Sequence, residues 1–191
     1  MLRWSAACQG KGLQIAAWLS ILITVLVETG LRVRKEALPL KWSDVSLDSE
    51  TAHIHVRDSK SAAGLRTAWL TNHCRDVLIE WRAMLGPEFS LYVFPSPRIP
   101  GMNITDYKSA WKKAAAKADL KDRRPYDLRS TFASRANGCR ASGITVAHLL
   151  GHASTQILST YVKPIDENTK AIMEALDALR NSQVGRVPSI H

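Results

Sequence analysis

The distribution of hydrophobic positions divides the chain into a long apolar helix, a strand-rich stretch and a series of amphipathic helices. Residues 12–28 are apolar almost all round, which predicts a helix that is buried on every side. Gly30 suits the C-terminal turn of that helix, because glycine adopts the left-handed conformation without strain. Residues 33–38 predict a further short helix, which Pro39 stops.

Three short runs with strand character follow, over residues 45–47, 52–57 and 65–70. In the second run, the polar residues His53 and His55 alternate with apolar neighbours, so that one face of the strand is predicted to be buried. The polar segment between the second and third runs predicts a turn.

The rest of the chain has mainly helical patterns, interrupted by an irregular proline-rich connection. Helices are predicted over residues 73–85, 105–118, 126–137, 145–150, 155–161 and 167–180. The fold class is therefore α+β, mainly helical, with one small three-stranded antiparallel sheet. We expect residues 1–165 to form one domain, and residues 166–191 to form a tail helix with a mobile end.

The apolar start of the chain could also be taken for a signal peptide or a membrane anchor, since Arg3 and Lys11 precede it. The run over residues 13–27 contains Gln14 and is shorter than the roughly 20 apolar residues that a spanning helix needs. Hydrophobic residues make up 46% of the 191 residues, which is ample for a soluble core. We therefore predict a buried helix and no membrane segment.

The spacing of the cysteines and of possible metal ligands does not alter the predicted fold class. Cys8, Cys74 and Cys139 are widely spaced and form neither a CxxC pair nor a zinc-binding spacing, which favours reduced thiols in a cytosolic protein. The sequence shows no carboxylate cluster or histidine pair suited to a metal. We therefore predict neither a metal nor another cofactor.

The positive charge of the chain is concentrated in one region. The net charge is +9, and residues 98–140 hold eleven Lys or Arg against four Asp or Glu. The segments on either side are nearly balanced. A solvated basic surface is one explanation, but a localised excess of this size favours an anionic partner, with nucleic acid the better candidate.

Two arginines and a late tyrosine suggest chemistry at a phosphodiester. A guanidinium forks onto phosphate oxygens and stays charged, so Arg32 and Arg129 are suited to neutralise the non-bridging oxygens. Tyr161 is suited to attack the phosphorus. Because an ordinary phenol has a pKa of about 10, it needs cationic neighbours or a base to become nucleophilic.

Two further residues can move or donate protons at the same phosphate. Lys60, in the predicted turn over residues 58–64, is suited to protonate the leaving oxygen as a general acid. His152 can donate a hydrogen bond or help in proton transfer. Taken singly, each candidate also has a structural interpretation: Arg32 could pair with Glu28 or Glu36, and Lys60 could be a solvated lysine.

Taken together, these patterns resemble the catalytic domain of the tyrosine recombinase family, also called phage integrases. The matching residues, in chain order, are Thr29-Gly30-Leu31-Arg32, Lys60 with Arg66-Thr67, Tyr126-Asp127-Leu128-Arg129, Leu149-Leu150-Gly151-His152 and Tyr161. The intervals of 23 residues from Arg129 to His152 and of 9 residues from His152 to Tyr161 also fit the family. Any one motif is weak, but five in the right order are specific.

The resemblance implies that the chain cleaves and rejoins double-stranded DNA through a transient 3′-phosphotyrosine bond, without a high-energy cofactor. It implies a catalytic role for Arg32, Lys60, Tyr126, Arg129, His152 and Tyr161. It also implies a homo-tetramer on DNA, with the segment over residues 166–180 docking on a neighbouring protomer. We expect a bacterial or phage-derived protein in the cytoplasm, associated with the nucleoid.

Three features depart from the family pattern. Tyr126 stands where histidine is usual; a phenol can hydrogen-bond a phosphate but is a poorer acid-base group near pH 7. Glu36 follows Arg32 by four residues, where many members have three. Only about a dozen residues precede the first helix, so we expect the family's N-terminal DNA-clamping domain to be absent and the chain to be a fragment or a natural truncation.

Two other functions stay open alongside a site-specific recombinase. A catalytically weak or inactive DNA-binding remnant is favoured by Tyr126 and by the short N-terminal part. A type IB topoisomerase-like enzyme would share the chemistry but relax supercoils without recombining. From the sequence alone we also expect Arg129→Ala to leave the fold intact while removing most of the transition-state stabilisation.

Overall fold

The structure of the chain is a computed structural model. The residues that it describes are 11–57, 65–86, 91–120, 122–139, 141–151 and 166–184. The turn predicted over residues 58–64 and the helix predicted over residues 155–161 lie outside this set.

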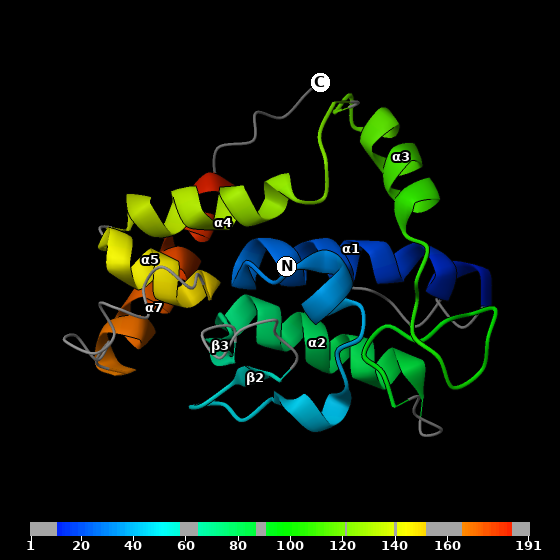
Figure 1. Ribbon diagram of the computed structural model, residues 1–191, viewed down its shortest axis with the longest axis horizontal. Coiled ribbons are helices and arrows are strands. Elements are labelled where there is room, and N and C mark those ends of the chain that lie inside the picture. The colour runs from blue at the N-terminus through cyan, green and yellow to red at the C-terminus, as the bar shows by residue number, and fades with distance from the viewer. Residues whose placement is uncertain are drawn as a thin grey trace.

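The described elements confirm a mainly helical fold with a small sheet (Figure 1). The helices are α1 (Lys11–Thr29), α2 (Asn72–Leu85), α3 (Lys108–Lys117), α4 (Asp127–Gly138), α5 (Gly143–Leu150) and α7 (Asp166–Val184). The strands are β1 (Val45–Ser46), β2 (His53–Val56) and β3 (Arg66–Trp69). They form one antiparallel sheet in the order β1-β2-β3.

Helix α1 runs through the middle of the molecule, with α4 on one side and α2 on the other (Figure 1). Its nearly continuous apolar sequence suits this position, because neighbours contact it from several directions. Leu22, Val25 and Leu26 of α1 are almost completely buried. Each such side chain contributes roughly 1.5–3 kcal/mol of burial free energy, so α1 organises the core.

The sheet has one buried and one exposed face, as the alternation in the sequence predicts. Ile54 and Val56 of β2 point into the core, and Ala68 of β3 pairs in register with Ile54. His53 and His55 point to the opposite face.

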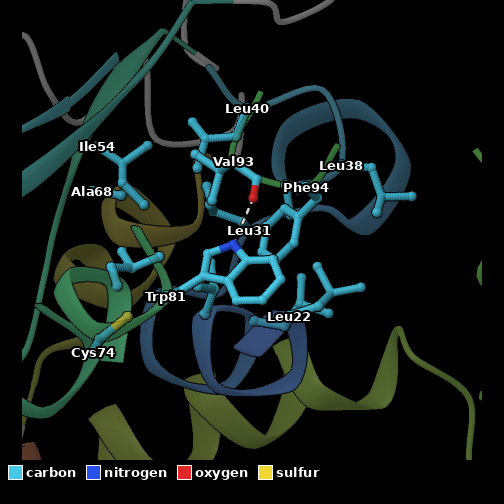
Figure 2. Close-up of a cluster of buried hydrophobic side chains, with 14 of the residues drawn as sticks. Leu22, Leu31, Leu38, Leu40, Ile54, Ala68, Cys74, Trp81, Val93 and Phe94 are labelled. Carbon is cyan, nitrogen blue, oxygen red and sulfur yellow. Dashed lines mark hydrogen bonds between the residues drawn. The ribbon is translucent and has the colours of Figure 1, made fainter. Parts of the chain in front are cut away.

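The larger hydrophobic core lies between α1, α2 and the sheet, and it continues into the segment before α3 (Figure 2). Trp81 of α2 is its largest fully buried side chain, and the indole Nε1 donates a hydrogen bond to the carbonyl oxygen of Val93 at 2.7 Å. Cys74 is also buried here, and desolvation raises the pKa of its thiol well above the ordinary value. Cys74 and Cys139 are free thiols, as predicted, and Cys8 lies outside the described residues.

A smaller core cluster joins α4, α5 and α7. Ile172, Met173 and Leu176 of α7 are buried against Phe132 of α4 and the apolar side of α5. The predicted apolar stripe of this last helix is therefore the surface by which α7 packs on its own chain.

The start of α3 and the end of α7 differ most from the predicted helix boundaries. Helix α3 begins at Lys108 rather than near residue 105, because the Asp106 carboxylate accepts a hydrogen bond from the Lys108 backbone N–H at 3.1 Å and favours a turn. Helix α7 continues to Val184, beyond the predicted end at residue 180. Among the described residues, no helix is both long and apolar enough to cross a membrane.

Candidate active site

The C-terminal turn of α1 brings three helices to one point. Gly30 has φ +65°, and its N–H donates to the Leu26 carbonyl at 3.0 Å, which ends the helix. A Cβ at this position would lie 2.6 Å from Phe132 of α4 and 2.9 Å from Leu150 of α5. Glycine is therefore needed here both for its backbone conformation and for the close approach of α4 and α5.

The turn after Arg32 is a single π-helical turn, Val33–Ala37, rather than the predicted ordinary helix. The Ala37 N–H donates to the Arg32 carbonyl at 3.0 Å, five residues earlier. Such a turn accommodates one residue more than an α-helical turn does. The π-helical turn therefore accommodates the four-residue spacing from Arg32 to Glu36, and the Glu36 carboxylate contacts Arg32.

Glu36 is the central anion of the site. Its side chain is 1% exposed and accepts hydrogen bonds from both the guanidinium and the backbone N–H of Arg32, the latter at 2.8 Å. Arg66 of β3 forks onto the same carboxylate with contacts of 3.3 and 3.1 Å. Burial alone would raise the pKa of Glu36, but the hydrogen bonds and charge of Arg66, together with Arg32, outweigh it and lower the pKa.

Arg129 of α4 is the more enclosed of the two predicted phosphate-binding arginines. Its side chain is 5% exposed, whereas that of Arg32 is 34% exposed. The guanidinium donates to the backbone carbonyls of Gly30 and Leu150, and Nη1 lies 4.0 Å from a Glu36 oxygen. Arg129 therefore ties the end of α1 to the end of α5.

Three successive carbonyls at the C-terminal end of α5 accept hydrogen bonds from three arginines. Arg66 Nε donates to Leu149 at 2.9 Å, Arg129 donates to Leu150, and Arg32 Nη2 donates to Gly151 at 3.3 Å. Carbonyls at this end of a helix lack intrahelical partners and carry partial negative charge, so guanidiniums stabilise them. Gly151 itself ends α5 in the left-handed conformation, with φ +64°.

This arrangement, which we call the arginine cluster (Arg32, Arg66 and Arg129 around Glu36), carries more positive than negative charge. Three guanidiniums surround one carboxylate, which leaves an excess of two positive charges. Desolvation and the nearby charge of Arg32 lower the pKa of Arg129 to about 10, so it stays charged at neutral pH. Such a cluster, partly open at Arg32, is suited to bind an anion with two or more acceptor oxygens.

The remaining predicted site residues are placed less directly. Tyr126 precedes α4 and is 60% exposed; in the described part of the chain no hydrogen bond joins its hydroxyl to the arginine cluster. Lys60, His152 and Tyr161 lie outside the described residues. Arg57 and Leu65 are the described residues at the two ends of the segment that holds Lys60, and Gly151 directly precedes His152.

The part played by Arg66 was not predicted from the sequence, and that of Glu36 was left open. Arg66 was recognised only as a residue that follows the lysine motif, although it is buried and contacts both Glu36 and α5. Its partners lie 30 and 83 residues away along the chain, so no local pattern could reveal them. The available signal was an arginine within a run of strand character, because an arginine that becomes buried is almost always paired.

Comparisons with known proteins show the family of the chain. The phage integrase family model matches residues 5–168 of the chain. The chain is 28% identical to tyrosine recombinase XerS of Streptococcus agalactiae serotype III over 161 residues, covering 81% of the chain and 44% of the relative. It is 29% identical to XerS of Streptococcus mutans serotype c with the same coverage. The chain thus spans less than half the length of these relatives.

Solved structures show the same fold. The XerH site-specific recombinase bound to its difH substrate in a pre-cleavage complex superposes with a TM-score of 0.60 at 27% identity, covering 82% of this chain and 45% of that one. XerA recombinase gives 0.58 at 24% identity, covering 98% and 65%. The Tn1549 transposon integrase in complex with transposon right-end DNA gives 0.58 at 15% identity, covering 88% and 65%. Because the family model spans most of the described elements, including the whole arginine cluster, the chain belongs to the phage integrase family.

Proposed function

We propose that the chain is the catalytic part of a site-specific DNA recombinase or integrase, which cleaves and rejoins DNA through a 3′-phosphotyrosine intermediate. The observation that carries this proposal is the arginine cluster, with its excess of two positive charges at the end of α5. A phosphodiester group brings one negative charge and two non-bridging oxygens, which fit guanidinium donors.

In the proposed reaction, Arg32 and Arg129 hold the non-bridging oxygens of the scissile phosphate and stabilise the charge that develops during attack. The Tyr161 hydroxyl loses its proton to solvent and its oxygen attacks the phosphorus, the bond to the 5′ oxygen breaks, and Lys60 supplies the proton that the leaving 5′-hydroxyl needs. His152 donates a hydrogen bond to the same phosphate. A 5′-hydroxyl from another strand then attacks the phosphotyrosine and releases Tyr161.

Arg66 and Glu36 act on the phosphate through their neighbours. The buried Arg66–Glu36 pair fixes the position of the Arg32 guanidinium, which is the most exposed member of the cluster. Holding this group before substrate arrives reduces the reorganisation that binding would otherwise require. In this proposal Tyr126 takes the place of the usual histidine as a hydrogen-bond donor to phosphate.

The partner in this proposal is double-stranded DNA, contacted in part by the basic region over residues 98–140. Lys112, Lys113 and Lys117 of α3 are exposed, as are Arg123 and Arg124 before α4. We further propose that the chain works as a homo-tetramer on DNA, with residues 1–165 as the catalytic domain and the tail exchanged between protomers. Within a single chain, α7 packs on α2, α4 and β3 of that same chain.

A catalytically weak DNA-binding remnant is the second candidate. The exposed position of Tyr126 favours it, because its side chain is 60% exposed and makes no hydrogen bond to the arginine cluster among the described residues. A remnant would bind DNA with a strong salt dependence and would form no covalent adduct.

A strand-transfer experiment separates the recombinase from both alternatives. The chain would be incubated with a labelled duplex nicked near its centre and with a second, unlabelled duplex that offers a free 5′-hydroxyl, using a pool with randomised sequence around the nick. A recombinase joins label to the second duplex, and Tyr161→Phe abolishes this. Relaxation of a supercoiled plasmid without strand exchange between paired sites would instead identify the topoisomerase-like activity, and DNA binding with neither reaction would identify the remnant.

A further inference from the structure

Outside the arginine cluster, two histidines on the exposed face of β2 point their ring nitrogens at each other. The Nε2 atoms of His53 and His55 lie 2.9 Å apart, with ring centroids 4.4 Å apart and the ring planes at 71°. Residues two apart on a strand share one face, so the backbone of β2 holds the two rings side by side. From the sequence we expected no histidine pair suited to a metal, and this geometry is the reason to consider one.

Both rings are oriented through their other nitrogen. His53 Nδ1 lies 2.5 Å from the carbonyl oxygen of Thr51, which can only accept. The His53 proton therefore resides on Nδ1, and its Nε2 presents a lone pair. His55 Nδ1 lies 3.4 Å from the Thr67 hydroxyl of β3, which can either donate or accept. His55 can therefore also carry its proton on Nδ1 and present the Nε2 lone pair.

The separation of the two Nε2 atoms matches that of two ligands on one metal ion. With metal–nitrogen bonds of 2.0–2.1 Å, two ligands at a right angle lie about 2.9 Å apart, and two at the tetrahedral angle about 3.3 Å apart. The observed 2.9 Å therefore matches the right angle between neighbouring ligands in square-planar or octahedral coordination. When no ion is bound, His55 can instead carry its proton on Nε2 and donate it to His53 Nε2, while its Nδ1 accepts from the Thr67 hydroxyl.

We propose that His53 and His55 form a bidentate site for a divalent transition-metal ion, with Cu²⁺ or Ni²⁺ the best fit. Imidazole nitrogens suit these ions, whereas Mg²⁺ requires oxygen ligands. In known metal sites, a hydrogen bond from the second ring nitrogen orients each ligating histidine. The contacts of His53 with Thr51 and of His55 with Thr67 are of this kind. The described residues contain no group of three or more His, Cys, Asp or Glu side chains for one ion, so water or another molecule completes the coordination.

This site lies on the face of the sheet opposite to the arginine cluster. It lies on the exposed face of the sheet, whereas Arg66 of β3 points to the buried face and into the arginine cluster. The ion would bind the folded pair more tightly than it binds the unfolded chain. It would therefore stabilise the fold by mass action. Metal binding is therefore measurable without any DNA substrate.

The test is a calorimetric titration of the full chain, carrying no added histidine tag, with Cu²⁺ and with Ni²⁺. His53→Ala and His55→Ala should each weaken the strongest binding step about tenfold or more, since each removes half of the chelate. His73→Ala, which removes a half-buried imidazole from α2, is the matched control and should leave that step unchanged. Equal binding by the wild type and the His55→Ala variant would overturn the proposal.

Three further measurements guard against a variant that simply misfolds. Thr67→Val keeps both ligands but removes the hydroxyl that orients His55, and should weaken binding by roughly tenfold. Electron paramagnetic resonance of the Cu²⁺ complex should show coupling to two imidazole nitrogens, and to fewer in His53→Ala. The indole of Trp69 lies 5.7 Å from the His53 ring, so bound Cu²⁺ should quench fluorescence that Trp69→Phe removes. Coupling or quenching that persists in the double histidine variant would place the ion elsewhere and contradict the assignment.

Discussion

At the scale of single residues, Glu36 determines the arrangement of the arginine cluster. It is almost fully buried, pairs with Arg32 and Arg66, and lies 4.0 Å from Arg129. Without its charge, three guanidiniums would face one another with little compensation. Replacing the anion should therefore affect stability as well as chemistry.

Glu36→Gln should lower the free energy of unfolding by about 3–5 kcal/mol at pH 7, because it leaves the buried Arg66 without its counter-charge. The pKa of Glu36 is lowered in the folded state. Its stabilising contribution is thus present above the unfolded value of about 4.3 and is lost as pH falls through the folded value. Urea unfolding between pH 7 and pH 3 should show this acid-dependent loss in the wild type and a smaller one in the variant.

Glu80→Gln, on the exposed side of α2, is the control for that experiment and should change the unfolding free energy little. If Glu36→Gln were as stable as Glu80→Gln across the whole pH range, Glu36 would not be the central anion of the site.

Arg32 and Arg129 should differ in what their replacement does. Arg32→Ala should slow DNA cleavage by about 10²–10³-fold with little change in stability, because the side chain is one-third exposed and Glu36 keeps Arg66. Arg129→Ala should slow cleavage similarly and also destabilise the fold, since buried carbonyls of Gly30 and Leu150 are left without their donor. The structure therefore changes the expectation, drawn from sequence, that Arg129→Ala leaves the fold intact.

Single-turnover cleavage rates and urea unfolding of both variants check this contrast. Equal stability of Arg129→Ala and the wild type would show that the two backbone hydrogen bonds contribute nothing measurable.

The chemistry of single residues could be predicted from the sequence better than their contacts. Arg32 and Arg129 were found as a pair because each lies in a local motif, and the structure does bring them to the same carboxylate. Arg66 was not assigned a role, because its hydrogen bonds to Glu36 and Leu149 join segments far apart in the chain. The placement of Lys60, His152 and Tyr161 stays a prediction.

At the scale of elements, the site depends on how closely α4 and α5 approach the end of α1. Gly30 makes this approach possible, since a Cβ there would lie 2.6 Å from Phe132 and 2.9 Å from Leu150. Both neighbours are rigidly packed core residues, so they cannot move without cost.

Gly30→Ala should therefore destabilise the fold by two contributions. The left-handed backbone costs an alanine about 1–2 kcal/mol, and overpacking adds about 1–3 kcal/mol. Gly101→Ala provides a matched control, because Gly101 has φ +76° but no atom within 4 Å of the position that a Cβ would take, and should show the first contribution alone. Thermal and urea unfolding of the two variants would separate the contributions; equal destabilisation would exclude a packing role for Gly30.

Hydrophobic periodicity predicted most elements but not the details that depend on capping or on tertiary contacts. The apolar run of α1 and the alternation in β2 indicated the right element types. The start of α5 was missed by two residues, because the cap is the Ser142 side chain, which accepts from Thr145 N–H at 3.1 Å. The π-helical turn after Arg32 was not predicted, since it depends on the ion pair that it accommodates.

At the scale of the whole molecule, the placement of α7 on its own chain determines whether the tail is available to a neighbour. Asp177 of α7 accepts a hydrogen bond from the Asn72 N–H at the start of α2 at 2.9 Å, where a negative charge is favourable. Leu176, beside it, is 1% exposed. A proposed exchange of the tail between protomers would have to break both interactions.

Leu176→Ala should lower the free energy of unfolding by about 2–5 kcal/mol, because it removes buried side-chain volume between α7 and α4. It should also reduce the hydrogen-exchange protection of α7 more than that of α1. The exposed Ala178→Gly change in the same helix is the control and should cost about 1 kcal/mol without detaching α7 selectively. A uniform decrease of protection across all helices in Leu176→Ala would argue that α7 is not a separable unit.

The positive charge of the molecule should dominate its affinity for DNA. Replacing the exposed Lys112 and Lys113 together by Gln should weaken binding to every DNA sequence alike and reduce the slope of log affinity against log salt by about 0.9 for each phosphate that is no longer neutralised. Arg82→Gln, on α2, removes a positive charge outside the basic region and should leave the slope nearly unchanged. Fluorescence anisotropy over a range of salt concentrations measures this slope, and a salt-independent affinity would contradict the basic-region assignment.

The most direct test of the central claim, that the arginine cluster holds a scissile phosphate for attack by Tyr161, is covalent trapping on nicked DNA. Duplexes with randomised sequence around the nick and a label on one strand would be incubated with the chain and resolved on a denaturing gel. We predict a shifted band that carries the label 5′ of the break, is absent in Tyr161→Phe and is strongly reduced in Arg32→Ala. A band that persists in Tyr161→Phe, or one that is unaffected in Arg32→Ala, would contradict the claim.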